Sequence, residues 1–338
     1  MSEALTSPTA PDRGVPQPDA QTIERLVSAA VAAPSMHNSQ PWRFRYLPAS
    51  RTVEIRAALE RSLPAEDPTG RGLHLSVGAA LFNLRVAVRV LGWEPVVRLL
   101  PHPAEPRLLA SVRLGGPVRP ATGPADTATF EAIWLRHSSR LPFTDEPVPA
   151  RLRVDAVAAA HAEGVGLLLP DPDECRRLLG LTAEAETRNL SDAERARESR
   201  SWVRERDDTP FGVPPEALGN VDHEARVPLR DFVGMRAAGR PAPVAFEAHP
   251  QLAVLVSPGD RPADWLRAGQ AMERVLLLAT AAGVRSSLLH QAVEWPDLRW
   301  MLRDPGTGPG YVQMLIRLGY GPEGAASPRA DASAVLER

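Results

Sequence analysis

Residues 78–92 read G-A-A-L-F-N-L-R-V-A-V-R-V-L-G, and residues 269–283 read G-Q-A-M-E-R-V-L-L-L-A-T-A-A-G. Both stretches begin and end on glycine, Ala80 aligns with Ala271, and most apolar positions coincide. This pattern predicts one long, buried helix in each half of the chain. Two alanine-rich helices can agree this far by chance, so the match alone only suggests a duplicated unit.

The residues around the first of these helices predict a second helix and four strands in the first half of the chain. Asp19 is placed to cap a helix that runs through Ala33 with one apolar face. The central helix is expected over residues 73–91, and the strands over residues 42–47, 53–57, 96–100 and 108–114.

The second half repeats this mixture of helices and strands. Helices are expected over residues 125–135, 149–161, 174–205, 262–282 and 296–302, and strands over residues 166–169, 252–256, 286–290 and 311–318. Between them, residues 206–246 form an irregular segment interrupted by prolines. Loops of this length in a compact domain are typical of lids and binding loops.

The amino-acid composition argues against several classes of function. The 338 residues are 43% hydrophobic and 24% charged with a net charge of −2, which indicates a soluble globular protein and disfavours a nucleic-acid partner. The sequence has no lysine, so all 39 basic residues are arginines and lysine-dependent chemistry is excluded. An anionic ligand would therefore be held by arginine forks, backbone amides or hydroxyls.

The remaining sequence features point to a cytoplasmic location. Residues 1–18 are rich in Ser, Pro and Ala, so we expect them to be disordered and not to be a signal peptide. The apolar stretch 73–91 carries His74, Arg85 and Arg89, which argues against a membrane span. A single cysteine and scattered histidines predict no metal site.

The loop after the first helix reads A-P-S-M-H-N-S-Q-P-W, residues 33–42. Its hydroxyl, carboxamide and backbone groups are suited to the edges of a flat heteroaromatic ligand. A helix-capping loop anchored by Trp42 explains the same residues, and the chemistry alone favours that simpler interpretation.

A second motif, R-H-S-S-R at residues 136–140, ends a predicted helix. Two arginines four positions apart around a hydroxyl can fork onto a phosphate or polarise a ring carbonyl. Among 39 arginines such a spacing also arises by accident, and a solvated helix end is the alternative interpretation. The glycine-rich run G-T-G-P-G at residues 306–310 precedes a strand and contains a proline, so it predicts a turn and not a dinucleotide-binding loop.

Together the two motifs resemble those of the FMN-dependent nitroreductase superfamily. A-P-S-x-x-N-x-Q-P-W is similar to its N-terminal signature, and R-H-S-S-R followed by L-P-F resembles its R-x-S-x-R flavin signature. Ordinary members carry both near the start of one subunit, and two subunits form two sites. Here they stand about a hundred residues apart, which resembles the Acg-like nitroreductases of actinobacteria, in which one chain mimics the dimer. The similarity runs from about residue 20 to the end and includes the strand at 313–321 and Ser-Pro-Arg at 327–329.

The resemblance implies an α+β fold, with a mixed sheet, surrounding helices and two half-sites fused as a pseudo-dimer. The first half would cover residues 19–120 and the second residues 125–322, with a lid-like segment at about 206–246 and a tail, 323–338, near the flavin phosphate. One FMN per chain is implied. The residues expected to bind it are Ser35, Met36, Asn38, Gln40, Trp42, Arg43, Arg136, His137, Ser138, Arg140 and Arg329. For Arg329, a frayed basic tail is the alternative interpretation.

The implied function is an oxidoreductase that takes hydride from NADH or NADPH and passes it to an electron-poor, nitro- or quinone-like small molecule. It requires no side-chain nucleophile or general base. The Acg-like resemblance also implies that the lid-like segment folds over the flavin, so a flavin-sequestering or sensing protein with little turnover is the alternative. A degenerate member that binds no flavin is a third interpretation, against which both motifs argue. Because the fused halves supply both sides of a site, either a monomer or a homodimer fits.

Overall fold

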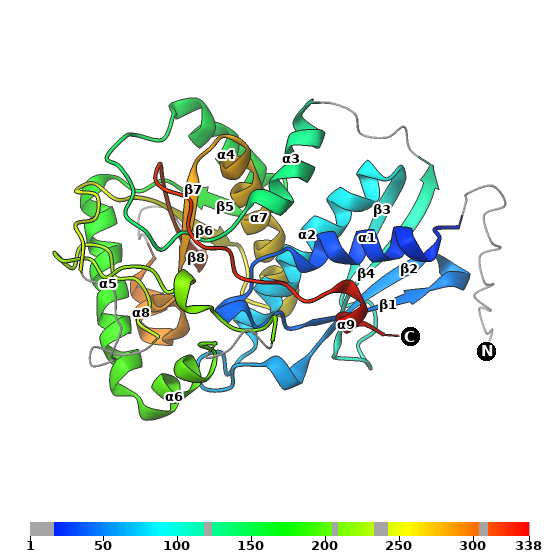
Figure 1. Ribbon diagram of the computed structural model, residues 1–338, viewed down its shortest axis with the longest axis horizontal. Coiled ribbons are helices and arrows are strands. Elements are labelled where there is room, and N and C mark those ends of the chain that lie inside the picture. The colour runs from blue at the N-terminus through cyan, green and yellow to red at the C-terminus, as the bar shows by residue number, and fades with distance from the viewer. Residues whose placement is uncertain (1–16, 118–123, 205–208, 233–242, 304–309, 338) are drawn as a thin grey trace, which may run out of the picture.

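The computed structural model describes residues 17–117, 124–204, 209–232, 243–303 and 310–337. Two β-sheets lie on either side of a central pair of long helices, α2 (Arg71–Val90) and α7 (Pro262–Ala281) (Figure 1). The chain is therefore an α+β protein, as the sequence predicts. The single mixed sheet that we expected is wrong, because the strands form two separate sheets.

The first sheet has the strand order β3-β4-β2-β1-β9 and is built mainly from the first half of the chain. The first half contributes the strands β1 (Trp42–Leu47), β2 (Thr52–Ala57), β3 (Trp93–Leu99) and β4 (Leu108–Pro117), together with helix α1 (Ala20–Val31). The Asp19 side chain accepts a hydrogen bond from Thr22 N at 2.8 Å and so begins α1. Alternation along β1 buries Trp42 and Phe44 in the core, as the period of a strand requires.

The second sheet has the antiparallel order β5-β6-β8-β7 and is built from the second half. Its strands are β5 (Gly166–Leu168), β6 (Gln251–Ser257), β7 (Arg285–Leu289) and β8 (Tyr311–Gly319). Besides α7, this half contributes the helices α3 (Pro124–Leu135), α4 (Ala150–His161), α5 (Pro172–Ser191), α6 (Ala193–Ser201) and α8 (Pro296–Met301). The helix expected over 174–205 is two helices, because Asp192 caps α6 by accepting from the backbone N–H groups of Glu194 and Arg195.

The C-terminal segment returns to the first sheet. After β8 the chain crosses the molecule, forms α9 (Ala332–Val335), and ends in β9 (Leu336–Glu337) beside β1 (Figure 1). Strand β9 pairs parallel with β1, with Phe44 opposite Leu336. Neither element was expected from the sequence patterns. The crossing carries residues 327–329 toward the cavity at the centre of the molecule.

The N-terminal prediction falls mostly outside the described residues, since residues 1–16 are not among them. Gln17 is described, and it is not disordered: its side chain donates to the Pro48 carbonyl at 3.3 Å and accepts from the Tyr46 hydroxyl at 3.1 Å.

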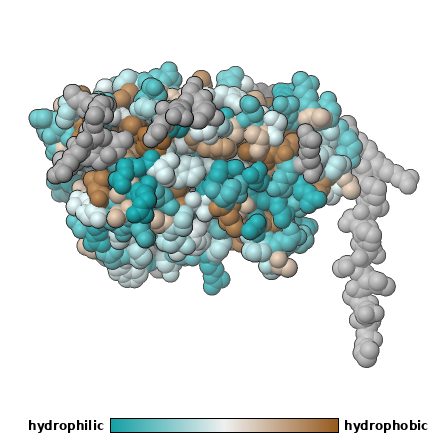
Figure 2. All heavy atoms as spheres, turned by 60° about the horizontal axis from the view of Figure 1, so that its bottom comes forward, coloured by the Kyte–Doolittle hydropathy of each residue, from teal (hydrophilic) through white to brown (hydrophobic). Residues whose placement is uncertain are grey.

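Helix α2 is long and apolar enough to cross a membrane, but 72% of its apolar window is buried inside the fold. That burial is what a core helix shows. The face of the molecule drawn in Figure 2 is largely hydrophilic, with smaller hydrophobic patches between the polar regions.

The central helices touch at the two glycines that the sequence comparison aligns. A Cβ atom on Gly78 would lie 2.3 Å from the Leu266 carbonyl oxygen, and one on Gly269 would lie 2.1 Å from the Leu75 carbonyl oxygen. Each glycine thus contacts the residue three positions before the other glycine. The contact is reciprocal, as across the two-fold axis of a symmetric dimer.

Because neither glycine can accept a side chain at this crossing, we expect Gly269→Ala to lower the free energy of unfolding by about 1–3 kcal/mol or more. Chemical denaturation measures it. Gly180→Ala is the matched control, because Gly180 lies within α5 and a Cβ there meets no atom within 4 Å. That control should leave stability unchanged or raise it by up to about 1 kcal/mol. Equal effects of the two substitutions would contradict the close crossing.

Candidate functional site

One cavity of about 570 Å³ brings together residues from both halves and from the C-terminal segment. Its wall includes the loop at 34–38, the residues Arg136, His137, Ser138 and Arg140, and Ser327 and Arg329 of the tail. The two sequence motifs, a hundred residues apart in the chain, therefore face one space. A cavity of this size is typical of a cofactor or small-molecule site.

The loop at 34–40 has an unusual backbone. His37, Asn38 and Gln40 have φ angles of 53°, 54° and 49°, in the left-handed region that side chains disfavour. Asn38 stabilises this conformation through its carboxamide: Nδ2 donates to the carbonyls of Pro210, Gly212 and Pro328, and Oδ1 accepts from Arg329 Nη1 at 2.8 Å. The amide therefore ties the loop to two segments that are remote in sequence.

Arg136 lies in the cavity wall, where it is buried and has few hydrogen-bond partners. Its Nη2 donates to the Ala32 carbonyl at 3.3 Å, while Nε and Nη1 have no hydrogen-bond partner among the described residues. The Glu273 carboxylate of α7 lies 3.6 Å from Nε, beyond hydrogen-bond distance. Burial raises the pKa of Glu273 to about 7, against the opposing effect of Arg136. Near neutral pH this carboxyl therefore neutralises Arg136 only in part.

Arg140 of the second motif and Arg329 of the tail line the same cavity. Arg140 donates to the Ala217 carbonyl at 2.7 Å, and burial, together with Arg230, lowers its pKa to about 10. Arg329 donates to Asn38 and to the Ser327 carbonyl, but its Nε has no hydrogen-bond partner among the described residues. Burial, and then repulsion from Arg136, lower the pKa of Arg329 to about 9. Together with the buried Arg136, the half-buried Arg140 and Arg329 place three positive charges from the motif and the tail at this wall.

Not all residues expected at the site line the cavity. Those that do are Ser35, Met36, Asn38, Arg136, His137, Ser138, Arg140 and Arg329. Gln40 is buried behind the loop, where its side chain donates to the Pro210 carbonyl and accepts from Ala330 N. Trp42 lies in the hydrophobic core, and Arg43 forms an exposed ion pair with Glu60. The structure therefore does not bring these three residues to the cavity.

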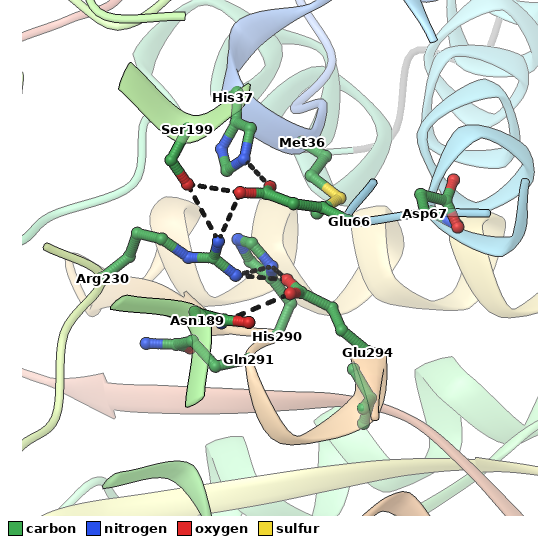
Figure 3. A network of polar contacts seen from close by, with 12 residues as sticks. Met36, His37, Glu66, Asp67, Asn189, Ser199, Arg230, His290, Gln291 and Glu294 are labelled. Atoms are coloured by element: carbon green, nitrogen blue, oxygen red, sulfur yellow. Dashed lines mark hydrogen bonds and ion pairs between the residues drawn. The ribbon is translucent and has the colours of Figure 1, made fainter. Parts of the chain in front are cut away.

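A network of buried charges borders the same cavity, and sequence reasoning missed it (Figure 3). Arg230 lies at its centre, with Nη1 2.9 Å from Glu66 Oε1 and Nη2 bonded to Glu294. Glu66 also pairs with His37, and Glu294 lies 2.5 Å from His290 Nδ1. We call these five residues the Arg230 network.

The Arg230 network keeps its carboxylates charged despite burial. Burial alone would raise the pKa of Glu66, but His37 and Arg230 hold it well below its usual value. Burial would likewise lower the pKa of Arg230, but Glu294 and Glu66 raise it above its ordinary value. Arg230 therefore forms true ion pairs with Glu66 and Glu294, which join residues of both halves.

The described part of the lid-like segment, residues 209–232 and 243–246, contacts the motif residues directly. Gly212 N donates to the Asn38 carbonyl at 3.2 Å, and Asn220 N donates to the Arg140 carbonyl at 3.3 Å. The Phe232 ring packs against the His37 ring and lies under the Arg140 guanidinium. Arg230 belongs to the same segment, so its ion pairs fasten the segment to the body of the protein.

Comparison with known proteins places this chain in a family. The chain is 35% identical over 327 residues to a Mycobacterium tuberculosis protein named "Putative NAD(P)H nitroreductase Rv3131", covering 95% of this chain and 92% of that one. It is 30% identical over 319 residues to "Putative NAD(P)H nitroreductase acg" of the same organism, covering 91% and 92%. The chain belongs to the Acg-like nitroreductase family. The resemblance seen in the two motifs is thereby confirmed.

We also compared this Acg-like chain with family models and with solved structures. No family model matches it. Among solved structures, the FMN-dependent nitroreductase NfnB from Mycobacterium smegmatis, in complex with NADPH, is 17% identical with a TM-score of 0.39, covering 63% of this chain and 99% of that one. A nitroreductase with bound FMN from Bacteroides fragilis is 16% identical with a TM-score of 0.36, covering 60% and 92%.

Proposed function

We propose that the chain binds one FMN in the cavity and uses it to pass reducing equivalents from NADH or NADPH to an electron-poor, nitro- or quinone-like small molecule. The observation that carries this proposal is the group of three arginines at the cavity, the buried Arg136 and the half-buried Arg140 and Arg329. Guanidinium N–H groups of Arg136 and Arg329 lack hydrogen-bond partners among the described residues. Buried charges of one sign are costly unless a counter-charge reaches them.

A phosphate is the ligand that fits these arginines. Guanidinium groups bind phosphate oxygens through strong, charge-assisted hydrogen bonds, and the chain has no lysine to take that role. Glu273 is the carboxylate beside Arg136, and with its pKa raised to about 7 it leaves the site cationic near neutral pH. A phosphate monoester would supply the missing negative charge.

The rest of the cavity suits a flat heteroaromatic ring. Ser35, Met36 and Asn38 come from the first half, and His137 and Ser138 from the second, so the ring would be held from both sides. Each half would contribute one of the two flavin motifs. The reciprocal contact of Gly78 and Gly269 supports a pseudo-dimer built from two fused halves.

When bound, FMN would supply the two-electron chemistry. The chain's own residues would bind and orient it: the arginines hold the phosphate end, and their positive charge favours an anionic, reduced ring. The segment 209–232 covers the site and limits the access of water and large acceptors. With both sides of the site in one chain, a monomer or a homodimer could carry this function.

The test compares the binding of FMN and riboflavin to the flavin-free protein by quenching of flavin fluorescence. We expect one FMN per chain and an affinity for riboflavin at least a hundredfold lower, because riboflavin lacks the phosphate that the three arginines would bind. Equal affinities would contradict the assigned phosphate site, and no binding of either flavin would refute the proposed function.

The affinity for FMN should also depend on pH through Glu273. Its pKa is raised to about 7, so the carboxyl is neutral below that pH and becomes a competing anion above it. At pH 6, wild-type protein and Glu273→Gln should therefore bind FMN with affinities within about twofold of each other. At pH 8, the wild type should bind FMN several-fold more weakly than Glu273→Gln does. Ionisation of the FMN phosphate affects both proteins equally, so it cancels in the ratio of their affinities at each pH. A ratio that does not change with pH would show that Glu273 does not act on the phosphate site.

A flavin-sequestering protein is the second candidate function. The observation that favours it is the set of bonds from residues 209–232 to Asn38 and Arg140, with Arg230 anchored in buried ion pairs. Sequestration predicts FMN that is retained tightly and bleached slowly by NADPH. Bleaching should then accelerate when a short Gly/Ser linker replaces residues 209–244, and equal rates in both proteins would argue for an open reductase.

A further inference from the structure

The end of the cavity formed by α8 and the start of β8 carries an aromatic cluster. Trp300, Arg303 and Tyr311 all line the cavity that contains the motif arginines. Trp300 is 67% exposed, an unusual state for so large an apolar side chain, and Tyr311 is 38% exposed. We call these three residues the rim cluster. Neither sequence motif includes them, and the proposed FMN contacts do not use them.

The rim cluster is held in place before any ligand arrives. The Arg303 guanidinium lies 4.3 Å from the centre of the Trp300 ring and 5.0 Å from that of Tyr311. Its Nε donates to the Gly310 carbonyl at 2.6 Å, which helps to hold the planar group beside the two rings. Because the side chains are already ordered, a ligand that stacks on them would lose little further conformational entropy.

A neighbouring ion pair fixes the helix that carries the cluster. Arg299 donates to both carboxylate oxygens of Asp260, at 2.7 and 2.9 Å, and to the Val312 carbonyl at 2.7 Å. This joins α8 to the loop after β6 and to β8. Trp300 is the next residue in α8, so its ring is presented at the cavity by a rigid element.

We propose that the rim cluster is the acceptor subsite, and that it binds a planar aromatic acceptor by stacking on Trp300, with Arg303 directed at the acceptor's nitro, carbonyl or carboxylate oxygens. The proposal rests on the proposed function, since it names where that site takes its substrate. An electron-rich indole face favours an electron-poor ring, and a guanidinium favours oxygen atoms that carry negative charge.

The test measures binding of 4-nitrobenzoate to the FMN-loaded, oxidised protein by isothermal titration calorimetry, with no reductant present. We expect Trp300→Ala to weaken binding about tenfold, as the loss of an aromatic stack predicts, and Trp300→Phe to recover part of the loss. Trp134→Ala is the matched control, because Trp134 is 53% exposed but does not line this cavity. It should change the affinity less than twofold.

Several outcomes would overturn the acceptor subsite. They are the absence of saturable binding to wild type, an affinity within twofold of wild type in Trp300→Ala, and an equal loss in Trp134→Ala. A larger loss of affinity for NADP⁺ than for 4-nitrobenzoate would assign the cluster to the reductant instead. A protein that takes up no FMN refutes the proposed function, whereas an FMN-loaded protein with unchanged acceptor binding refutes only this inference.

Discussion

Replacing Arg230 by Met is expected to lower the free energy of unfolding by about 3–5 kcal/mol, because it leaves the buried Glu66 and Glu294 carboxylates without their shared cation. The substitution keeps the side chain's volume but removes its charge. It should also release residues 209–232 from the body, so that FMN dissociates faster. Urea denaturation and the rate of FMN release measure the two effects.

Arg188→Met provides the control for this prediction. Arg188 also joins two carboxylates, Glu184 and Asp297, but the side chains of all three are at least one-third exposed. Exposed ion pairs contribute little, so the loss should stay below about 1 kcal/mol. If Arg230→Met were no more destabilising than Arg188→Met, the Arg230 network would not anchor the segment.

The double substitution Arg136→Ala and Arg140→Ala is expected to reduce FMN affinity by at least a hundredfold. Each substitution would remove charge-assisted hydrogen bonds to the phosphate that contribute about 1.5–3 kcal/mol to binding. The two losses together exceed the roughly 2.7 kcal/mol that corresponds to a hundredfold change in affinity. FMN content after dialysis and the dissociation constant measure the effect.

The affinity for riboflavin provides an internal control for the double variant. Riboflavin has no phosphate, so its weak binding should change much less. A surface double variant, Arg151→Ala with Arg176→Ala, should bind FMN as wild type does, because both side chains are mostly exposed. Unchanged FMN content in the Arg136 and Arg140 variant would refute the site assignment.

Local sequence patterns predicted most of the helices and strands, because their causes are local. Asp19 caps α1 where the sequence places a cap, and the alternation that buries Trp42 and Phe44 marks β1. The long apolar runs became the two central helices. The glycine pair that the repeat aligned, Gly78 and Gly269, is the place where those helices meet.

The separation into two sheets could not be predicted in this way. Strand pairing depends on contacts between residues far apart in the chain, and periodicity carries no information about partners. The C-terminal strand β9 is two residues long, too short for any periodic signal. Its pairing with β1 nevertheless directs the tail that carries Arg329 across the cavity.

The motifs located part of the candidate site, and the structure supplies the rest. Arg136, Arg140 and Asn38 line one cavity, but Trp42 and Arg43 do not, because they already belong to β1. Alternation along that strand sends Trp42 into the core and Arg43 to the surface. Arg230 stands in an irregular, proline-rich segment and Glu294 follows no recognisable motif. Their pairing is a tertiary contact between residues 64 positions apart, which a single sequence does not reveal.

The most direct test of the central claim is an anaerobic absorbance spectrum of the purified, FMN-supplemented protein, recorded before and after an excess of NADPH and then of NADH. Flavin-binding reductase chemistry predicts a bound-flavin spectrum that bleaches and regains its colour when a nitroaromatic or quinone acceptor is added. A bound flavin that keeps its colour with both reductants would contradict the reductase function and favour sequestration. A protein with no flavin spectrum would contradict the site itself.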